Sequence, residues 1–182
     1  MPVLMHHHQT EAALVQRVRR GEPEAVAALF DKYGESVYRL AYRVLGTRED
    51  AEDTVQDVFS GLSSALARYE EHGTFGAWLN RVTARTALMR LRAERRRDAV
   101  APRDSSDLAA GAASHGDIAL RMTLEAAQAR LPDRLRVVFV LRMIEGYSHD
   151  EIANTLRISV SASKVRPHRA VQQLQQALRG SL

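Results

Sequence analysis

Residues 131–178 read LPDRLRVVFVLRMIEGYSHDEIANTLRISVSASKVRPHRAVQQLQQAL, and this stretch decides the fold of the chain. Apolar residues recur at helical spacing over residues 135–144, and Ser148 with Glu151 matches a capping box that opens a short helix. A tight turn follows, in which Ser159 is placed to cap a last helix. A short helix, a three-residue turn and a longer basic helix are typical of a helix-turn-helix, whose second helix enters the major groove of DNA. An ordinary helical hairpin is the alternative, and the basic residues of the last helix favour DNA binding.

Composition limits the class of protein. The 182 residues are 45% hydrophobic and only 5% aromatic, which favours one or two small domains of helices packed through Leu, Val and Ala. The formal net charge of +4 is small, so local clusters of charge matter more than the total. The absence of cysteine excludes a disulfide framework and a thiolate metal site. No apolar run approaches the roughly 20 residues of a membrane span, and we predict a soluble, cytoplasmic protein.

The chain is predicted to be all-α, with two small helical domains joined by a flexible linker. Residues 1–10 contain three consecutive histidines and are predicted to be a disordered tail or part of a tag, without a functional role. Residues 11–97 form the first domain, with helices expected over residues 11–20, 25–45, 48–69 and 75–97. Residues 98–116 are rich in Ala, Ser, Asp and Gly and are predicted to be the linker. Residues 117–182, with the helix-turn-helix, form the second domain.

The helix expected over residues 48–69 is acidic at its start. Its first three turns carry Glu49, Asp50, Glu52, Asp53 and Asp57. Acidic residues at a helix N-terminus interact favourably with the helix dipole, but this effect fades within the first turn and does not account for Asp57. A docking surface for a basic partner, ending in Val58 and Phe59, is the other interpretation.

The next helix, over residues 75–97, reverses the sign of the charge. Trp78 shares a face with apolar residues, which indicates a role in the core. The helix then carries Arg81, Arg85, Arg90, Arg92, Arg95, Arg96 and Arg97 against Glu94. A basic helix face with an aromatic residue near its start is typical of contact with phosphates and single-stranded nucleic acid. A solvated arginine face is the alternative.

The sequence contains no catalytic motif. There is no Gly-rich phosphate loop, no HExxH motif and no cysteine nucleophile. The acids of residues 49–57 lack histidine partners and the glycine of a calcium loop. We therefore predict no enzyme activity, no metal and no cofactor.

Taken together, these segments resemble the extracytoplasmic-function subfamily of the sigma-70 family of bacterial RNA polymerase sigma factors. The resemblance rests on GEPEAVAALFDKYGESVYRLAYRVLG (21–46), TREDAEDTVQDVF (47–59), GTFGAWLNRVTARTAL (73–88) and LPDRLRVVFVLRMIEGYSHDEIANTL (131–156). It implies an alternative sigma factor that binds core RNA polymerase and directs promoter-specific initiation through the −10 and −35 elements. A stand-alone helix-turn-helix regulator is the alternative, and it would need a dimer surface to span two half-sites.

The resemblance implies three sets of site residues. Binding to core polymerase, through the coiled coil of the β′ subunit, is implied for Asp50, Asp53, Gln56, Asp57 and Phe59. Contact with the −10 element is implied for Trp78, Arg81, Arg85, Arg90 and Arg92. Contact with the −35 element is implied for Ser148, Ser161, Ser163, Lys164, Val165, Arg166, His168 and Arg169. The further partners that it implies are the β subunit and an anti-sigma factor, and the free protein is expected to be a monomer.

The chain departs from the family pattern at four positions. Arg85 and Met89 stand where the family usually has Asn and Asp, and the added arginine should strengthen attraction to phosphates. Ser163 and Pro167 stand at usually apolar positions of the last helix. An interior proline costs a helix about 3 kcal/mol. We therefore predict a recognition helix kinked or frayed over residues 163–167, a lowered −35 affinity, and a gain on Pro167→Leu substitution.

Overall fold

The computed structural model describes residues 10–67, 69, 74–98, 124 and 126–179, and every regular element within them is a helix. The elements are α1 (Glu11–Arg19), α2 (Pro23–Leu45), α3 (Arg48–Ser60), α4 (Leu62–Leu66), α5 (Phe75–Asp98), α7 (Asp133–Phe139), η1 (Val140–Ile144), α8 (His149–Leu156) and α9 (Val160–Arg179). Residues 126–129 are also helical. The all-α prediction is confirmed. The predicted tail before Thr10 and the predicted linker after Asp98 lie outside the described residues.

Side-chain caps begin several helices where the sequence predicted them. The Thr47 hydroxyl accepts a hydrogen bond from the Asp50 amide (3.3 Å) and begins α3. Ser148 and Glu151 form both halves of the capping box of α8. The Ser159 hydroxyl accepts from the Ala162 amide (3.1 Å) at the start of α9. Since these caps satisfy amides that have no partner inside the helix, they fix the first turns and the length of the turn between α8 and α9.

Two helices end differently from the prediction. The helix expected over residues 48–69 stops at Ser60, and α4 starts after Gly61, because glycine is a poor helix former and tolerates the break. The helix expected up to Ile144 changes from α to π geometry after Phe139. Its last hydrogen bond runs from the Glu145 amide to the Val140 carbonyl (3.0 Å), over five residues instead of four.

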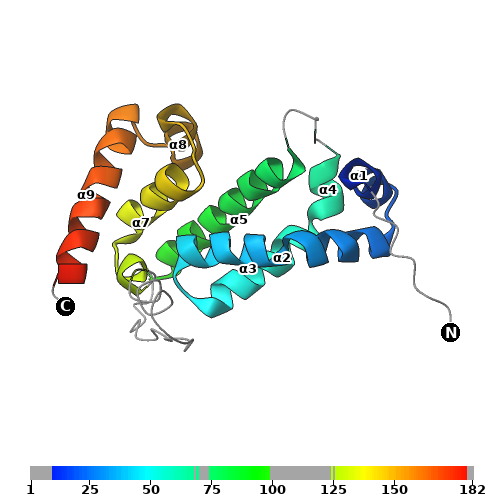
Figure 1. Ribbon diagram of the computed structural model, residues 1–182, viewed down its shortest axis with the longest axis horizontal. Coiled ribbons are helices and arrows are strands. Elements are labelled where there is room, and N and C mark those ends of the chain that lie inside the picture. Colours follow the sequence, from blue (N-terminus) through cyan, green and yellow to red (C-terminus); the bar gives the residue numbers. More distant parts are fainter. Residues whose placement is uncertain (1–9, 68, 70–73, 99–123, 125, 180–182) are drawn as a thin grey trace.

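The sequence predicted a recognition helix that is either kinked or frayed over residues 163–167, and the fraying is wrong. The structure shows α9 as one uninterrupted helix with Pro167 inside it (Figure 1). The fixed backbone angle of proline is compatible with a helix, and its missing N–H removes a single hydrogen bond. The Pro167 ring is buried. The lowered −35 affinity stays a prediction, because a continuous helix can still bend at an interior proline.

The N-terminal helices α1–α5 surround an apolar core of their own. Its members are fully or almost fully buried and come from all five helices; they include Val18, Leu29, Val58, Leu62, Leu66, Phe75 and Leu79. Figure 1 shows α1 and α4 at one end of the molecule and α7, α8 and α9 at the other. A smaller core of Leu131, Leu135, Ala170 and Leu174 joins α9 to α7 and to the segment before it.

A third core joins the two halves of the chain. From the N-terminal half it contains Leu40, Val44 and Leu45 of α2, Ala51 of α3, and Ala84, Leu88 and Leu91 of α5. From the C-terminal half it contains Val137, Val138, Val140, Leu141, Tyr147 and Ile152. The sequence left the relative packing of the halves open, and the structure shows them packed together through apolar side chains.

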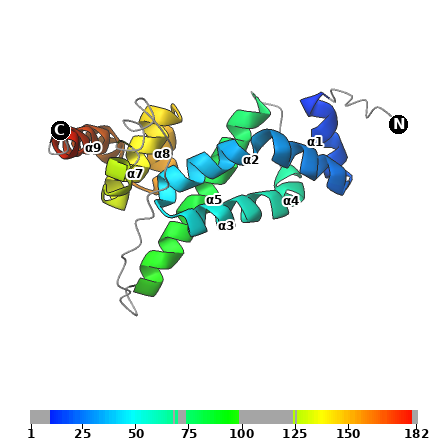
Figure 2. The ribbon, with the colours of Figure 1, turned by 60° about the horizontal axis from the view of Figure 1, so that its bottom comes forward.

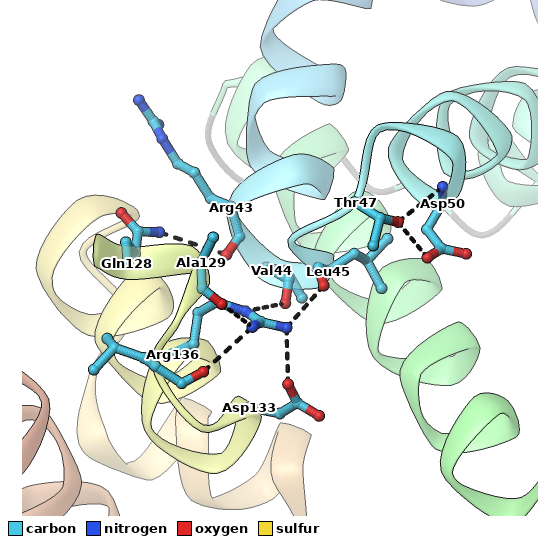
Figure 3. A network of polar contacts seen from close by, with 10 residues as sticks. Arg43, Val44, Leu45, Thr47, Asp50, Gln128, Ala129, Asp133 and Arg136 are labelled. Atoms are coloured by element: carbon cyan, nitrogen blue, oxygen red, sulfur yellow. Dashed lines mark hydrogen bonds and ion pairs between the residues drawn. The ribbon is translucent and has the colours of Figure 1, made fainter. Parts of the chain in front are cut away.

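Arg136 of α7 lies at the centre of this packing and is only 5% exposed. Its guanidinium donates to the carbonyls of Val44 (3.0 Å) and Leu45 (2.8 Å) at the end of α2. It also donates to the carbonyls of Ala129 and Leu131 and to the Asp133 carboxylate (2.9 Å) (Figure 3). The last carbonyls of a helix lack partners within it and carry partial negative charge. One buried cation therefore caps α2 and holds the C-terminal half against it.

Gly46 makes this contact possible. Its φ of 90° lies in the left-handed region that favours glycine at the end of a helix. A Cβ at this position would also lie 3.3 Å from the Arg136 guanidinium, so the guanidinium would have to shift to admit a side chain there.

Replacement of Arg136 by Met should lower the free energy of unfolding by about 3 kcal/mol or more, because several buried carbonyls would lose their donor. Urea denaturation followed by circular dichroism measures the change. Arg134→Met is the matched control, since Arg134 is exposed on the same helix, and its effect should stay within about 0.5 kcal/mol. Equal effects of the two substitutions would contradict the role given to Arg136.

Candidate functional site

The acidic residues of α3 face a cation of α5. Arg90 donates to the carboxylates of Asp53 (2.8 Å) and Asp57 (2.9 Å) and lies 3.8 Å from Asp50. The sequence had grouped Arg90 with the DNA-binding arginines, but the structure places it among the predicted polymerase-binding acids. Gln56 is exposed beside this cluster. Because Arg90 offsets part of the negative charge, a partner would meet a mixed surface and not a purely acidic one.

Glu94 of α5 lies beside Asp50 at the edge of the same cluster. Burial, followed by a hydrogen bond with the Asp50 carboxyl, raises the pKa of Glu94 to about 7. Two carboxyl groups in contact resist double ionisation, so they retain a proton at pH values where an ordinary glutamate has lost it. The charge of this surface therefore changes near neutral pH.

An apolar groove of about 710 Å³ lies between α2 and α3. Its apolar lining consists of Val26, Phe30, Tyr38, Val55 and Phe59, and Glu35, Glu52 and Gln56 also line it. Phe59 is buried and packs edge-on against Phe30 (5.1 Å between ring centroids), while Phe30 remains 47% exposed. The sequence predicted Phe59 but missed Phe30, Val55 and Tyr38. The sequence did contain a signal for such a groove, because the apolar stripe of α2 is wider than one neighbouring helix can cover.

The remaining arginines of the predicted −10 set face away from α3. Arg81, Arg85 and Arg92 are exposed and line a cavity between α5 and α8. Arg92 donates to the Thr155 carbonyl of α8 (3.1 Å). Trp78 is partly buried and stacks against Tyr69 (4.8 Å between centroids) and Phe75 (5.4 Å), which confirms its predicted role in the core.

The outer face of α9 carries most of the predicted −35 set. Its exposed members are Ser161, Lys164, Val165, His168 and Arg169, and Arg166 is half-buried. Ser163 instead points inward: it is fully buried, and its hydroxyl lies 3.0 Å from Nδ1 of His149. The Ser148 hydroxyl is used in the cap of α8. Ser163 is therefore a contact between α8 and α9 and is not placed to touch DNA.

Comparisons with known proteins agree with this arrangement. Residues 29–97 match the family model of sigma-70 region 2, and residues 121–174 match that of sigma-70, region 4. RNA polymerase sigma factor CarQ of Myxococcus xanthus is 33% identical over 90% of this chain and 95% of its own length. The chain belongs to the extracytoplasmic-function subfamily of the sigma-70 family.

Other relatives extend this result. ECF RNA polymerase sigma factor SigW of Bacillus subtilis is 29% identical over 91% of this chain and 95% of its own length. ECF RNA polymerase sigma factor SigE of Mycolicibacterium smegmatis is 36% identical over 82% of the chain, and the match spans 60% of that longer relative. In fold, the chain is similar to the sigma factor RpoE of Bartonella quintana, solved in complex with the anti-sigma factor NepR. That structure has a TM-score of 0.67 and 20% identity and covers 84% of this chain and 96% of its own.

Both matched regions support the function of an alternative sigma factor that directs transcription. Sigma factors are transcription initiation factors and not enzymes. Within the described residues, no helix is long and apolar enough to cross a membrane.

Replacement of Glu94 by Gln should change how stability depends on pH. An ordinary glutamate has a pKa near 4.5, and folding raises that of Glu94 to about 7. Between these values the folded protein keeps a proton that the unfolded chain has lost, so stability falls as pH rises through this range. Because Gln does not ionise, the stability of the variant relative to the parent should grow from pH 5 to pH 8.

Urea denaturation at unit pH intervals measures this difference. Glu35→Gln is the control, because Glu35 is exposed on α2 and should give a nearly constant difference. A pH-independent difference for Glu94→Gln would contradict the raised pKa.

Proposed function

We propose that this chain binds core RNA polymerase through the α2–α3 surface and directs it to promoters through α5 and α9. The observation that carries the proposal is the exposed basic face of α9, the second helix of a helix-turn-helix, on the same chain as an exposed apolar groove beside acidic residues. A helix that binds duplex DNA needs an exposed basic face. Docking on another protein needs an exposed apolar surface. A stand-alone regulator could use the groove only as its dimer surface.

The polymerase-binding surface would combine the groove with the residues of α3 beside it. Asp50, Asp53 and Asp57 are tied to Arg90, so they supply a fixed pattern of charge and not free carboxylates. Gln56 and the exposed edge of Phe30 remain free to contact a partner helix. We propose that this helix belongs to the coiled coil of the β′ subunit, with apolar residues in the groove and basic residues against the acids.

Contact with the −10 element would come from α5. Arg81, Arg85 and Arg92 are exposed along one side of the helix and can neutralise the phosphates of a melted strand. Trp78 would act by packing, since it supports the start of α5 from within the core. Arg90 is excluded from this proposal by its contacts with the acids of α3.

Contact with the −35 element would come from the outer face of α9. Ser161, Lys164 and Val165 lie in its first turns, where a recognition helix meets base edges. His168 and Arg169 lie further along, where they can meet phosphates. Ser148 and Ser163 support the helix pair through the cap of α8 and the contact with His149.

Further proposals follow from family membership. We propose 11–97 and 117–182 as the two domains and 98–116 as their connection; the two matched regions, 29–97 and 121–174, fall within these domains. We also propose contact with the β subunit, a monomeric free state and regulation by an anti-sigma factor. RpoE, a protein of the same fold, was solved in complex with one. Since polymerase and promoter DNA are cytoplasmic in bacteria, the chain would act there.

Joint replacement of Gln56 and Asp57 by Ala should weaken binding to core polymerase at least tenfold, because the substitutions remove polar groups beside the groove. Phe30→Glu should have a similar effect, since it places a charge on the apolar surface and Phe30 is exposed enough to be replaced without unfolding. Fluorescence anisotropy with labelled protein and purified core polymerase measures both.

Glu24→Ala is the control for that experiment, because Glu24 is an exposed acid of α2 outside the groove. Unchanged affinity of the double variant would overturn the proposed surface. DNA binding by a dimer, with no affinity for core polymerase, would favour the stand-alone regulator.

Replacement of Lys164 or Arg169 by Ala should weaken binding of the polymerase holoenzyme to −35 duplex DNA. Each should reduce the slope of log K against log salt by about one, if each neutralises one phosphate. Ser163→Ala should leave that slope unchanged, because Ser163 is buried. Titration at several salt concentrations distinguishes them, and a reduced slope for Ser163→Ala would contradict the orientation of α9.

A further inference from the structure

A cavity of about 610 Å³ lies between α5 of the N-terminal half and α8 of the C-terminal half. Its lining brings together Arg81, Arg85, Leu88, Met89 and Arg92 of α5 with Tyr147, Glu151, Asn154, Thr155 and Arg157. Its volume is within the range of small-molecule sites in proteins. The cavity exists because the shared core holds the two halves together, so neither half forms it alone.

The lining has a strong excess of positive charge. Four arginines face a single carboxylate, that of Glu151, so three positive charges are in excess. The Glu151 carboxylate is already engaged, since it accepts hydrogen bonds from the amide and the hydroxyl of Ser148 (2.8 Å each). In the part of the chain that the structure describes, no carboxylate lies within ion-pair distance of Arg81, Arg85 or Arg157. Guanidinium groups gathered without counterions attract an anion.

Tyr147 adds an independent indication. Its side chain is 8% exposed, and its hydroxyl finds no hydrogen-bond partner among the described residues. A buried hydroxyl without a partner costs about 1–3 kcal/mol. Burial also raises the pKa of Tyr147 to about 12, so the phenol stays neutral and can donate to an anionic oxygen. Tyr147 lines the cavity, so a buried donor without a partner lies in its wall beside these cations.

Arg157 is held in an unfavourable backbone conformation. Its φ of 54° is the single positive value found for a non-glycine residue in the described parts of the chain. This conformation costs an ordinary residue about 1–2 kcal/mol, and glycine or asparagine is usual at such a helix end. Strained residues gather at functional sites, and this one places a guanidinium in the cavity wall.

We propose that this cavity binds a compact polyphosphate, either free or as the phosphate chain of a nucleotide. Phosphate groups carry several charges in a small volume and accept bidentate hydrogen bonds from arginine. A ligand with a single carboxylate could balance only one of the three excess positive charges of the lining. The Tyr147 hydroxyl would donate to a phosphate oxygen, and Leu88 and Met89 would form the apolar wall. Because the arginines come from both halves, the bound ligand would bridge α5 and α8 and stabilise their packing.

Isothermal titration of the full chain with sodium tripolyphosphate tests the proposal. We expect saturable binding with one site and a rise in the melting temperature. Tyr147→Phe removes only the hydroxyl, and Arg157→Gly removes a cation at a position that glycine adopts without strain, so both variants should fold. Each should weaken binding about tenfold, the loss expected for one charge-assisted hydrogen bond.

Arg134→Ala is the matched control, because it removes one exposed positive charge outside the cavity and should leave affinity within about twofold. No binding, or equal binding by all variants, would overturn the proposal. Tighter binding of a glutamate-rich peptide of the same net charge would overturn the assignment to phosphate. A comparison of GTP with tripolyphosphate then distinguishes a nucleotide from a free polyphosphate.

Single-stranded promoter DNA provides a last comparison, because its phosphates would bind the same Arg81, Arg85 and Arg92 as the polyphosphate. Arg157→Gly should weaken tripolyphosphate binding but leave DNA binding unchanged, since Arg157 lies on the α8 side. Equal loss for both ligands would show that the cavity serves only DNA and would overturn the proposal. Tripolyphosphate binding is measured without polymerase or promoter, so its failure is distinguishable from failure of the proposed function.

Discussion

The packing of the two halves depends on one buried guanidinium at the end of α2. Arg136 donates to carbonyls of Val44 and Leu45 in one half and of Ala129 and Leu131 in the other. The apolar side chains around it supply the attraction, but they tolerate many relative orientations. Buried hydrogen bonds tolerate few orientations, because each carbonyl left without a donor costs free energy. The guanidinium therefore selects one orientation out of those that the apolar contacts allow.

This orientation determines which surfaces stay open. The α2–α3 groove and the outer face of α9 are exposed, so both proposed docking surfaces are accessible when the halves are packed together. Arg81, Arg85 and Arg92 of α5 are placed differently, because they face α8. Arg92 already donates to the Thr155 carbonyl, so a DNA strand would either use its remaining N–H donors or replace this contact. Contact with polymerase and with the −35 element is thus compatible with halves that are packed together. Full contact of DNA along α5 competes with this packing.

Local signals predicted most of the fold. The caps at Thr47, Ser148 and Ser159 depend on residues three positions apart, and each forms as expected. The π-helical turn of η1 was not predictable, because the hydrophobic pattern does not distinguish it from an α-helix. The prediction of fraying at Pro167 was wrong, because it counted the lost hydrogen bond alone and could not include the packing of a buried residue.

The structure places the predicted site residues on the expected helices, but several of them face in directions that the sequence did not predict. Arg90 and Arg92 are two positions apart on α5, and helical geometry turns them by about 200° relative to each other. One therefore meets the acids of α3, and the other meets α8. Ser163 lies next to Lys164, yet it is buried against His149. Identity and spacing gave the correct helices, but the face that each residue occupies depended on neighbours far away in the chain.

Two of the departures from the family pattern, Arg85 and Met89, affect the charge at the interface between the halves. Arg85 and Met89 stand where the family usually has Asn and Asp, and both line the cavity between α5 and α8. With Asn and Asp there, the excess of three positive charges would fall to one, because one cation would be lost and one anion gained. Such a lining would have little attraction for a polyanion. The two departures from the family pattern therefore account for two of the three excess positive charges. The strain at Arg157 then adds a cation from the opposite wall, where glycine would be easier to accommodate.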